Sequence, residues 1–407
     1  MVLHTRVVTG TGGGPEKTIL NSPRYLRKYG FDSACLFMRP PGDEGFAVLE
    51  KKAAAADAEI LGLDDRGPFD WNVVRQCIRA CREREVNIWH AHDYKSNALG
   101  LLVQKFHPMH LVTTAHGWVR FTSKTPLYYR IDRFCMKRYR EVICVSQDLV
   151  EACRKTGVAA ERLQLIDNAI VLDDYSTQPP TLKDRMKFGF DSGITVIGAA
   201  GRLSEEKGFH HLIDAVARLI RDGHQVGLVI AGEGHLREQL QQQIDLHEMQ
   251  SHIRLAGFLS DPRDLYRAVD LFVLSSIREG LPNVVLEAMA SQRPVVVTAC
   301  NGIPRLVEND RNGVVVRPDS VESLYNGIQK CLSSSSFCRS IAAEGRTTIE
   351  EQFCFDRRMQ KVIRVYGKLS DQLRAYTERR LNDVTHESGD SNPMAAQPVD
   401  TKLAVSV

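Results

Sequence analysis

Four charged residues in the second half of the chain have types and spacings suited to binding a sugar joined to a phosphate. Arg202 and Lys207 stand five residues apart where a predicted strand turns into a helix, so both can reach one anion over the helix start. Glu279 precedes a predicted helix, and Glu287 lies about a turn and a half inside it. Carboxylates beside an anion need neutral hydrogen-bond donors, such as sugar hydroxyls.

Each half of this pattern has a plainer interpretation. The two cations could pair with Glu205 and Glu206 on a surface turn, and the glutamates at positions 279 and 287 could be solvated. Charge and spacing alone leave these alternatives open.

A short apolar run would position the glutamates. The segment Leu271 to Leu274 is predicted to be a buried strand, and Gly280 to Pro282 a turn. Pro282 suits the first helical position, because the amide that it lacks would have no partner there. The residues that follow continue an apolar helical face: Val284, Val285, Ala288 and Met289. Free amides near residues 280–284 would then point out of a helix N-terminus, which favours anions.

Residues 279–290, EGLPNVVLEAMA, closely resemble the motif of the family 4 glycosyltransferases in which seven residues separate two glutamates. The string GRLSEEKG from Gly201 is similar to a second pattern of that family. The resemblance covers Val2 to Arg379. It implies an enzyme that moves a sugar, with retention at the anomeric carbon, from a UDP- or GDP-linked donor to a glycan or lipid-linked acceptor in cell-envelope or polysaccharide biosynthesis.

The resemblance also implies roles for individual residues. Arg202 and Lys207 would neutralise the diphosphate, Glu287 would bind the ribose hydroxyls, and Glu279 would bind hydroxyls of the donor sugar. Phe258 would lie near the base, with core packing as an equal alternative. The expected catalytic residues are Glu279, His116, Arg202 and Lys207. The expected donor contacts are Arg202, Lys207, Phe258, Leu259, Glu279, Gly280, Leu281, Asn283, Val284 and Glu287.

A glycine-rich loop follows the first predicted strand, Val2 to Val8. Its glycines are Gly12, Gly13 and Gly14, and their spacing does not match the dinucleotide-binding fingerprint. A flexible turn is one interpretation. In family 4 enzymes this loop faces the cleft between the domains, and the resemblance implies the same here.

Three histidines follow or end predicted strands of the first half. His116 comes after the strand His110 to Ala115, where family 4 enzymes often direct a histidine toward the donor sugar. His90 and His92 would point the same way from one strand, as metal ligands can. No third ligand is evident, so no metal site is predicted.

Two loops depart from the family pattern. Val171 stands where the family usually has an aspartate, and Asn301 and Arg305 stand where it has a glycine and an acid. These departures weaken the implication of a ligand contact from either loop.

Strand-like and helix-like segments alternate along most of the chain, which is typical of α/β proteins with a parallel sheet. With the resemblance, this predicts two Rossmann-like, doubly wound domains facing across a cleft, the GT-B fold. The expected divisions are an acceptor domain at 1–171, a linker at 172–190, a donor domain at 191–354, a helix at 355–380 returning to the first domain, and a disordered tail at 381–407.

No pair of aspartates separated by one residue occurs in the sequence, so we expect neither a metal ion nor another cofactor. Cations and a helix N-terminus would replace the metal. Two other functions remain open: a nucleotide-sugar epimerase of the same fold, and a non-catalytic sugar-nucleotide-binding subunit.

A net charge of +3 and an apolar share of 43% give no reason to expect nucleic-acid binding. The start lacks the pattern of a secretory signal, so the ten cysteines are expected to be reduced and the protein cytoplasmic. Basic and aromatic residues alternate from Arg120 to Arg140. This segment could contact the inner face of a membrane, or it could simply be a solvated face.

Overall fold

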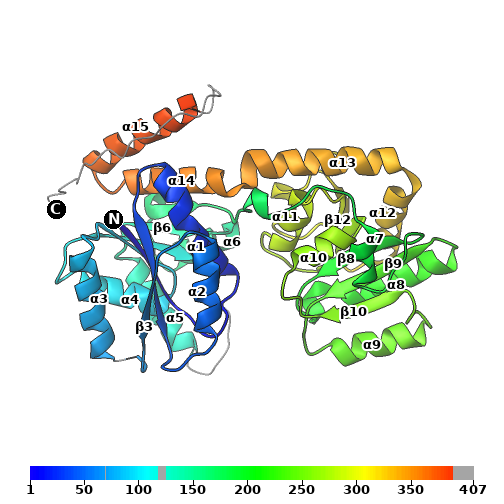
Figure 1. Cartoon of the computed structure of the whole chain (residues 1–407), viewed down its shortest axis with the longest axis horizontal. Coiled ribbons are helices and arrows are strands. Elements are labelled where there is room, and N and C mark those ends of the chain that lie inside the picture. The colour runs from blue at the N-terminus through cyan, green and yellow to red at the C-terminus, as the bar shows by residue number, and fades with distance from the viewer. Residues whose placement is uncertain (69, 118–124, 388–407) are drawn as a thin grey trace. The chain divides into compact units, whose positions relative to one another are not determined.

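The computed structural model describes residues 1–68, 70–117 and 125–387 (Figure 1). Its internal contacts divide the chain into two units. Unit 1 comprises Met1–Asp167 and the segment that begins at Arg358, and unit 2 comprises Asn168–Arg357. Each unit is built around one parallel sheet.

Unit 1 contains a seven-stranded sheet in the order β3-β2-β1-β4-β5-β6-β7. Its strands are β1 (Val2–Val7), β2 (Ser33–Arg39), β3 (Ile60–Asp64), β4 (Ile88–Ala91), β5 (His110–Ala115), β6 (Glu141–Cys144) and β7 (Leu163–Leu165). Strands β4 and β6 are buried along their whole length, although each contains one polar residue, His90 in β4 and Glu141 in β6.

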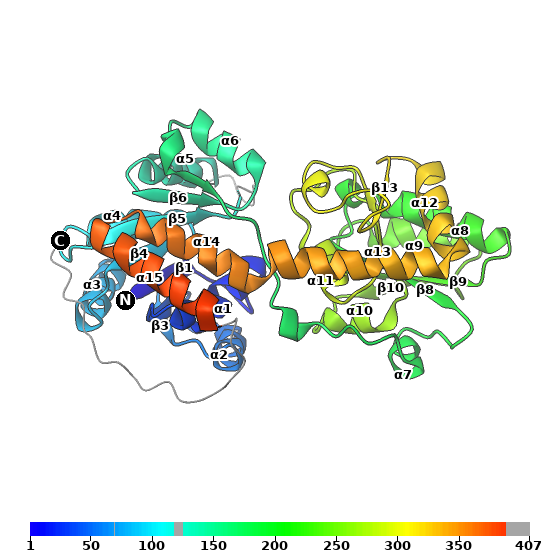
Figure 2. The same ribbon diagram turned by 90° about the horizontal axis from the view of Figure 1, so that it is seen from above.

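Helices of unit 1 lie on both faces of this sheet (Figure 1). They are α1 (Gly14–Lys28), α2 (Phe46–Ala55), α3 (Trp71–Glu83), α4 (Tyr94–Val103), α5 (Thr125–Met136) and α6 (Gln147–Lys155), followed late in the chain by α14 (Phe355–Gly367) and α15 (Asp371–Glu387). Figure 2 shows α14 and α15 side by side. The hydroxyl of Tyr376 on α15 donates a hydrogen bond to the carbonyl of Gly30, which fastens this late segment to unit 1.

Unit 2 contains a six-stranded sheet in the order β10-β9-β8-β11-β12-β13. Its strands are β8 (Thr195–Ala200), β9 (Val226–Ala231), β10 (Ile253–Gly257), β11 (Leu271–Leu274), β12 (Val295–Thr298) and β13 (Val314–Val316). Its helices are α7 (Leu182–Met186), α8 (Phe209–Arg221), α9 (Arg237–Leu246), α10 (Arg263–Ala268), α11 (Asn283–Ala290), α12 (Val321–Ser333) and α13 (Ser335–Thr348), and a π-helical turn (Ile349–Phe353) follows α13. Single-turn 3₁₀ helices occur in both units at Ala160–Arg162, Leu172–Asp174, Glu205–Lys207 and Ile303–Arg305.

Both sheets have the same strand order when strands are counted within each unit. The first strand lies between the second and the fourth, so the winding reverses between β1 and β4 in unit 1 and between β8 and β11 in unit 2. Ligands of such sheets bind outside the carboxyl ends of the strands at this switch point. The prediction of two doubly wound, Rossmann-like parallel sheets is confirmed.

Several segments differ from the expected secondary structure. Helix α2 was not expected, although Phe46, Leu49 and Ala53 have helical spacing and are buried. Residues 172–190, for which a linker is predicted, belong to unit 2, where Phe190 and Tyr175 lie in a core cluster. Helix α15 extends to Glu387, and the remaining tail, 388–407, lies outside the described residues.

The ten cysteines are all free thiols, and nine of them are buried, so they behave as small core residues. None of the helices in the described ranges is long and apolar enough to cross a membrane.

Candidate active site

The turn after β8 is held tightly against the turn after β11. Gly208, which precedes α8, has a φ of 60°, and a Cβ there would lie 2.4 Å from the carbonyl oxygen of Ser275. The hydroxyl of Ser275 donates to the carbonyl of Lys207 at 2.8 Å, and the amide of Ile277 donates to the carbonyl of Glu206 at 2.8 Å. Only glycine allows this approach without strain, so the two loops form one rigid surface at the switch point of unit 2.

Lys207 and Glu279 meet on this surface as an ion pair. The hydroxyl of Ser276 donates to the same carboxylate at 2.9 Å. Both side chains are largely shielded from water, with 20% of the lysine and 13% of the glutamate exposed. The structure thus brings together two residues to which the family resemblance assigns neighbouring parts of the donor: the diphosphate to Lys207 and the sugar to Glu279.

The other charged groups of this turn form no ion pair with Lys207 in the described part of the chain. Hydrogen bonds to Ser204 and the backbone lower the pKa of Glu206, and the charges of Lys207 and Arg202 lower it further. The carboxylate oxygens of Glu205 are both 3.1 Å from Nε2 of His235, and Arg202 is exposed. The alternative in which Lys207 pairs with Glu205 or Glu206 is therefore not the arrangement found.

Helix α11 begins directly after the turn that carries Glu279. Pro282 occupies the N-cap position, and its carbonyl accepts from the amides of Val285 and Leu286, so Asn283 and Val284 are the two helical amides that precede the first bond of the helix. Gly302 packs against this turn so closely that a Cβ would lie 1.8 Å from the carbonyl oxygen of Gly280. The loop of Gly302, which departs from the family pattern at Asn301 and Arg305, supports the glutamate turn through this contact.

Glu287 is half-buried on α11 and hydrogen-bonded to tyrosine. The hydroxyl of Tyr266 donates to its Oε2 at 2.8 Å. Burial raises the pKa of Tyr266 and of Tyr175, and the charge of Glu287 raises both further. Sequence patterns missed both tyrosines. A buried tyrosine needs a partner for its hydroxyl, but sequence spacing does not identify the partner.

The two residues expected near a nucleotide base have different environments. Phe258 is 78% exposed, and its backbone amide donates to Glu233 at 3.3 Å. Leu259 is half-buried and packs against the core of unit 2. Core packing therefore does not account for Phe258.

The glycine loop of unit 1 is held by one acid on the following helix. Glu16, in the first turn of α1, accepts a hydrogen bond from the amide of Gly13 at 2.7 Å and forms an ion pair with Arg6 at 2.5 Å. Burial alone would raise the pKa of Glu16, but the Arg6 guanidinium and the Gly13 amide hold it below its usual value. Gly12 has a φ of 71°, and Gly14 begins α1. The contacts of Glu16 with Gly13 and Arg6 therefore hold this loop against its neighbouring strand and helix.

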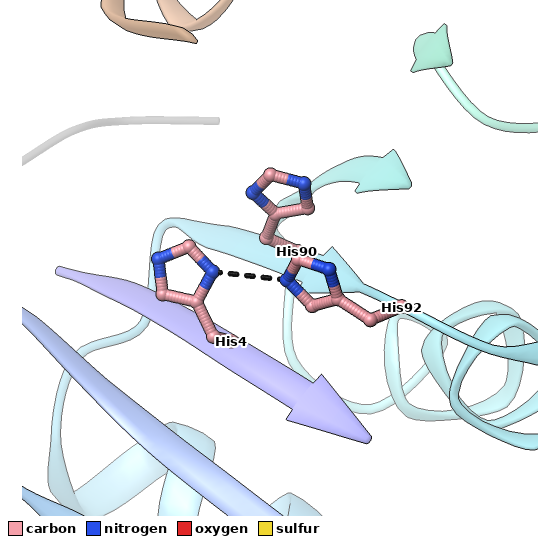
Figure 3. Close-up of side chains that lie close together, drawn as sticks. All are labelled: His4, His90 and His92. Atoms are coloured by element: carbon pink, nitrogen blue, oxygen red, sulfur yellow. Dashed lines mark hydrogen bonds between the residues drawn. The ribbon is translucent and has the colours of Figure 1, made fainter. Parts of the chain in front are cut away.

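His116 belongs to a cluster of histidines at the carboxyl edge of the sheet of unit 1. His4 on β1 pairs in register with His90 on β4, and His92 follows two residues later. Nitrogen atoms of His4, His90 and His92 lie within 4.8 Å of one another (Figure 3). The sequence did not identify His4 as a third member, because strand pairing between distant segments is not visible in local spacing.

Burial keeps these rings neutral. It lowers the pKa of His4 to about 3 and the pKa of His90, His92 and His116 well below the usual histidine value. The charge of Arg358 lowers the pKa of His4, His90 and His116 further. Neighbouring histidines lower the pKa of His90 and His92, and the charge of Arg6 lowers that of His92 and His116. The cluster therefore holds uncharged imidazoles at neutral pH.

Two protein families match the chain, one in each half. The family described as Glycosyltransferase Family 4 matches residues 12–174, and the family described as Glycosyl transferases group 1 matches residues 181–348. The second match contains Arg202, Lys207, Glu279 and Glu287.

Named relatives match both halves together. The putative glycosyltransferase EpsD of Bacillus subtilis is 26% identical over 323 residues, which cover 75% of this chain and 84% of that protein. The UDP-Gal:alpha-D-GlcNAc-diphosphoundecaprenol alpha-1,3-galactosyltransferase of Escherichia coli is 24% identical over 297 residues, covering 70% and 76%.

A similar fold occurs in the crystal structure of Anabaena HepE in complex with UDP and glucose. The TM-score is 0.73 at 23% identity, and the match covers 91% of this chain and 100% of that one. At this level of identity the likeness establishes the fold.

Proposed function

The chain belongs to the family 4 glycosyltransferases, and from that premise we propose that it transfers a sugar from a nucleoside diphosphate sugar to a glycan or lipid-linked acceptor with retention at the anomeric carbon. Its family supports a place in polysaccharide or cell-envelope biosynthesis. The observation that carries the proposal is the Lys207–Glu279 pair beside the start of α11. We assign the donor to the UDP- or GDP-linked class. HepE in complex with UDP and the UDP-Gal-named relative favour UDP.

The diphosphate is assigned to the surface formed by the turns after β8 and β11. Lys207 would exchange its bond to Glu279 for a phosphate oxygen, and the exposed Arg202 would provide a second positive charge. The unpaired amides at the start of α11 favour the same anion. These groups would stabilise the departing phosphate without a metal ion.

Exchange of Lys207 onto phosphate releases Glu279 for the donor sugar. A carboxylate accepts hydrogen bonds only, so free sugar hydroxyls would replace the ammonium as its donors. Glu287 is assigned to the ribose hydroxyls by the family resemblance. It already accepts hydrogen bonds from Tyr266 and Tyr175, and a carboxylate has about four lone-pair sites. The exposed Phe258 is assigned to the base, on which its ring could stack.

Retention would follow from attack on the same face that the phosphate leaves, with the departing phosphate taking the acceptor proton. The alternative is a covalent intermediate, which needs a carboxylate placed as nucleophile. A sugar trapped covalently on Glu279 and seen by mass spectrometry would overturn the same-face mechanism.

Two parts of unit 1 complete the assignment. By the family resemblance, His116 would hydrogen-bond the donor sugar, and the loop of Gly12, Gly13 and Gly14 is assigned to the cleft. Burial lowers the pKa of His116 well below its usual value, so its uncharged imidazole is suited to hydrogen-bond a sugar hydroxyl.

A groove between α4 and α5 is proposed as a peripheral contact with an anionic membrane that carries a lipid-linked acceptor. The open volume is about 970 Å³. Ile131 and Phe134 are exposed there, and Lys105, Arg130 and Arg138 surround them. Apolar side chains ringed by cations fit a surface of acidic lipids. Arg120 to Lys124, also part of the predicted segment, lie outside the described residues.

Thermal unfolding with a panel of nucleotides and nucleotide sugars tests the proposed function. A ligand that binds only the folded protein stabilises it by about 2.7 kcal/mol at a concentration 100 times its Kd. We expect one nucleotide class to raise the Tm of the wild type. Lys330→Ala is the control, because it removes an exposed lysine of unit 2 that pairs with Asp310, and it should show the same rise. Lys207→Ala should lose the rise.

Incubation of the matching nucleotide sugar with and without acceptor then separates the enzyme classes. A transferase should release nucleotide mainly when acceptor is present. Conversion of the sugar without acceptor, or stabilisation by no member of the panel, would contradict the proposal.

A further inference from the structure

Two buried tyrosines hold the carboxylate of Glu287 from different segments of unit 2. The hydroxyl of Tyr266 on α10 donates to Oε2 of Glu287 at 2.8 Å, and Tyr175, which precedes α7, donates to the same carboxylate. Tyr266 is 1% exposed and Tyr175 is 4% exposed, whereas Glu287 is half-buried. Hydrogen bonds to an ionised acceptor are strong, so the two phenols fix the carboxylate in place although the residue remains partly exposed.

The ring of Tyr266 is itself fixed by its neighbours. It packs against the ring of Phe272 on β11, with centroids 5.7 Å apart, and edge-on against Tyr175, with centroids 6.2 Å apart. All three rings belong to one core cluster of unit 2. A ring packed in a dense core keeps one orientation, so the hydroxyl of Tyr266 stays directed at Glu287.

A buried guanidinium links the backbone segments that carry the tyrosines. Arg293 is 6% exposed, and its Nε donates to the carbonyl of Tyr266 at 2.7 Å. Its Nη2 donates to the carbonyl of Gln178, shortly after Tyr175. Its backbone amide donates to the carbonyl of Ala288 on α11 at 2.9 Å. One residue therefore connects both tyrosine segments to the helix that carries the carboxylate.

The position of Glu287 suits the ribose of a nucleotide whose phosphates lie at the start of α11. Glu287 is one turn beyond Asn283, or about 6 Å farther along the helix axis. The hydroxyls of a ribose lie on the far side of its ring from the phosphate, at a comparable distance. A carboxylate has about four lone-pair sites, which allows two phenols and two ribose hydroxyls to donate to it together.

We propose that Tyr175 and Tyr266 are positioning residues that select ribonucleotides over 2′-deoxyribonucleotides by holding Glu287 against the ribose hydroxyls. The proposal rests on the proposed function, in which unit 2 binds the nucleotide, and deepens it by assigning the selectivity for ribose. A carboxylate held in place loses a hydrogen bond when the 2′-hydroxyl is absent, whereas a mobile carboxylate turns to water and loses little. The tyrosines thus determine how much affinity a missing hydroxyl removes.

A role confined to the core is the competing explanation of the two tyrosines. Each buried phenol needs a hydrogen-bond acceptor, and Glu287 could serve that purpose alone. The two explanations differ in their effect on nucleotide binding. Looser core packing would weaken ribonucleotides and deoxyribonucleotides by the same factor. Loss of a held carboxylate would weaken the binding that uses the 2′-hydroxyl, and would therefore lower the ratio of the two affinities.

Isothermal titration of the full-length protein with UDP, 2′-deoxy-UDP, GDP and 2′-deoxy-GDP tests the proposal. In the wild type we expect the Kd of the deoxy form to exceed that of the ribonucleotide by about tenfold or more. Tyr266→Phe keeps the ring and removes only the hydroxyl, so this ratio should fall severalfold. Tyr175→Phe should lower the ratio as well, and the double variant should bring it close to one.

Tyr325→Phe is the matched control. Tyr325 is a buried tyrosine of unit 2 whose hydroxyl also donates to a carboxylate, that of Asp222 at 2.8 Å, but it belongs to a different core cluster from Tyr266. This variant should leave the ratio unchanged. Glu287→Gln shows whether the tyrosines act through Glu287. It should lower the ratio by itself, and adding Tyr266→Phe to it should cause no further fall.

The wild-type titration separates failure of this proposal from failure of the proposed function. Equal affinity for the ribose and deoxyribose forms, a ratio unchanged in both tyrosine variants, or an equal fall in Tyr325→Phe would overturn the proposal and leave the proposed function standing. Binding of neither UDP nor GDP would contradict the proposed function and this proposal together. If Tyr266→Phe does not fold, the ratio in Tyr175→Phe decides.

Discussion

The ammonium group of Lys207 and the carboxylate of Glu279 form an ion pair, although 72 positions separate them in the sequence. Lys207 lies in the turn after β8, and Glu279 lies in the turn after β11. These strands are neighbours at the switch point of unit 2, so the fold brings the residues together. In the ligand-free site each charge neutralises the other.

Removing the cation should impair transfer strongly. In Lys207→Ala, the leaving phosphate loses a positive group and Glu279 keeps an uncompensated charge beside it. We expect kcat/KM to fall by about 100-fold or more, the size of effect seen when one stabilising donor is removed from a reaction centre. Rates of nucleotide release with donor and acceptor present would measure the loss.

Two variants serve as references for that measurement. Lys330→Ala removes an exposed lysine of unit 2 and should retain full activity. Lys207→Arg keeps the charge and should recover part of the lost rate. Full activity of Lys207→Ala would remove this residue from the active site.

Gly302→Ala should disturb the glutamate turn. A Cβ at Gly302 would lie 1.8 Å from the carbonyl oxygen of Gly280, so one of the two loops must shift. We expect nucleotide-sugar affinity to fall at least about tenfold, and stability to fall by about 1–3 kcal/mol because of the overpacking. Isothermal titration and urea unfolding would measure the two effects.

Gly193→Ala is the control for this substitution. Its added Cβ would lie 3.4 Å from Asp191, which is near ordinary contact distance. Affinity should be unchanged. An effect on affinity as large as that of Gly302→Ala would show that general loosening of unit 2, and not the glutamate turn, controls binding.

The histidine cluster predicts that unit 1 loses stability in mild acid. Burial depresses the pKa of His4 to about 3 in the folded protein, whereas an unfolded histidine has a pKa of about 6.5. Below pH 6.5 the unfolded chain binds more protons, so the free energy of unfolding falls as the pH is lowered. Each such histidine contributes about 1.4 kcal/mol per pH unit. Urea unfolding at pH 7.0, 6.0 and 5.0 would reveal the slope.

His4→Phe tests the source of that slope, because it removes one buried titrating group. The slope of the free energy of unfolding against pH should decrease by the contribution of one histidine. Stability that stays constant from pH 7.0 to 5.0 in the wild type would contradict the burial argument for the whole cluster.

Phe134→Asp should weaken binding to vesicles that contain acidic lipid. Phe134 is 55% exposed in the groove between α4 and α5, and a carboxylate there would meet negative headgroups. We expect co-sedimentation with such vesicles to fall at least about fivefold, and wild-type binding to weaken with salt. Leu246→Asp changes an apolar residue of unit 2 that is more exposed, at 84%, and should have no effect. If wild-type protein does not sediment with acidic vesicles, the proposed membrane contact is wrong.

The sequence predicted the fold well because the evidence for it is local. Strands such as β11 are short apolar runs, and their alternation with helices indicates a parallel sheet. The family-like motifs around Arg202 and Glu279 are also local, because each lies within one strand-to-helix turn. Helix α2 was missed, although the spacing of Phe46, Leu49 and Ala53 is helical.

The missing parts of the site depend on contacts between distant segments. His4 joins His90 through strand pairing, Tyr266 reaches Glu287 from another helix, and Gly302 supports Gly280 from a third loop. No spacing rule connects these pairs in one sequence. The exposure of Phe258 is also a tertiary property, and the structure decides it against the packing alternative.

The pairing of Lys207 with Glu279 has a consequence for the order in which substrate is captured and product is discharged. On the proposed function, a nucleoside diphosphate alone would take Lys207 away from Glu279 and offer the carboxylate no substitute, whereas an intact nucleotide sugar would supply hydroxyls to it. The spent nucleotide would then bind less tightly than the fresh donor. Return of Lys207 to Glu279 would favour product release and restore the ligand-free site.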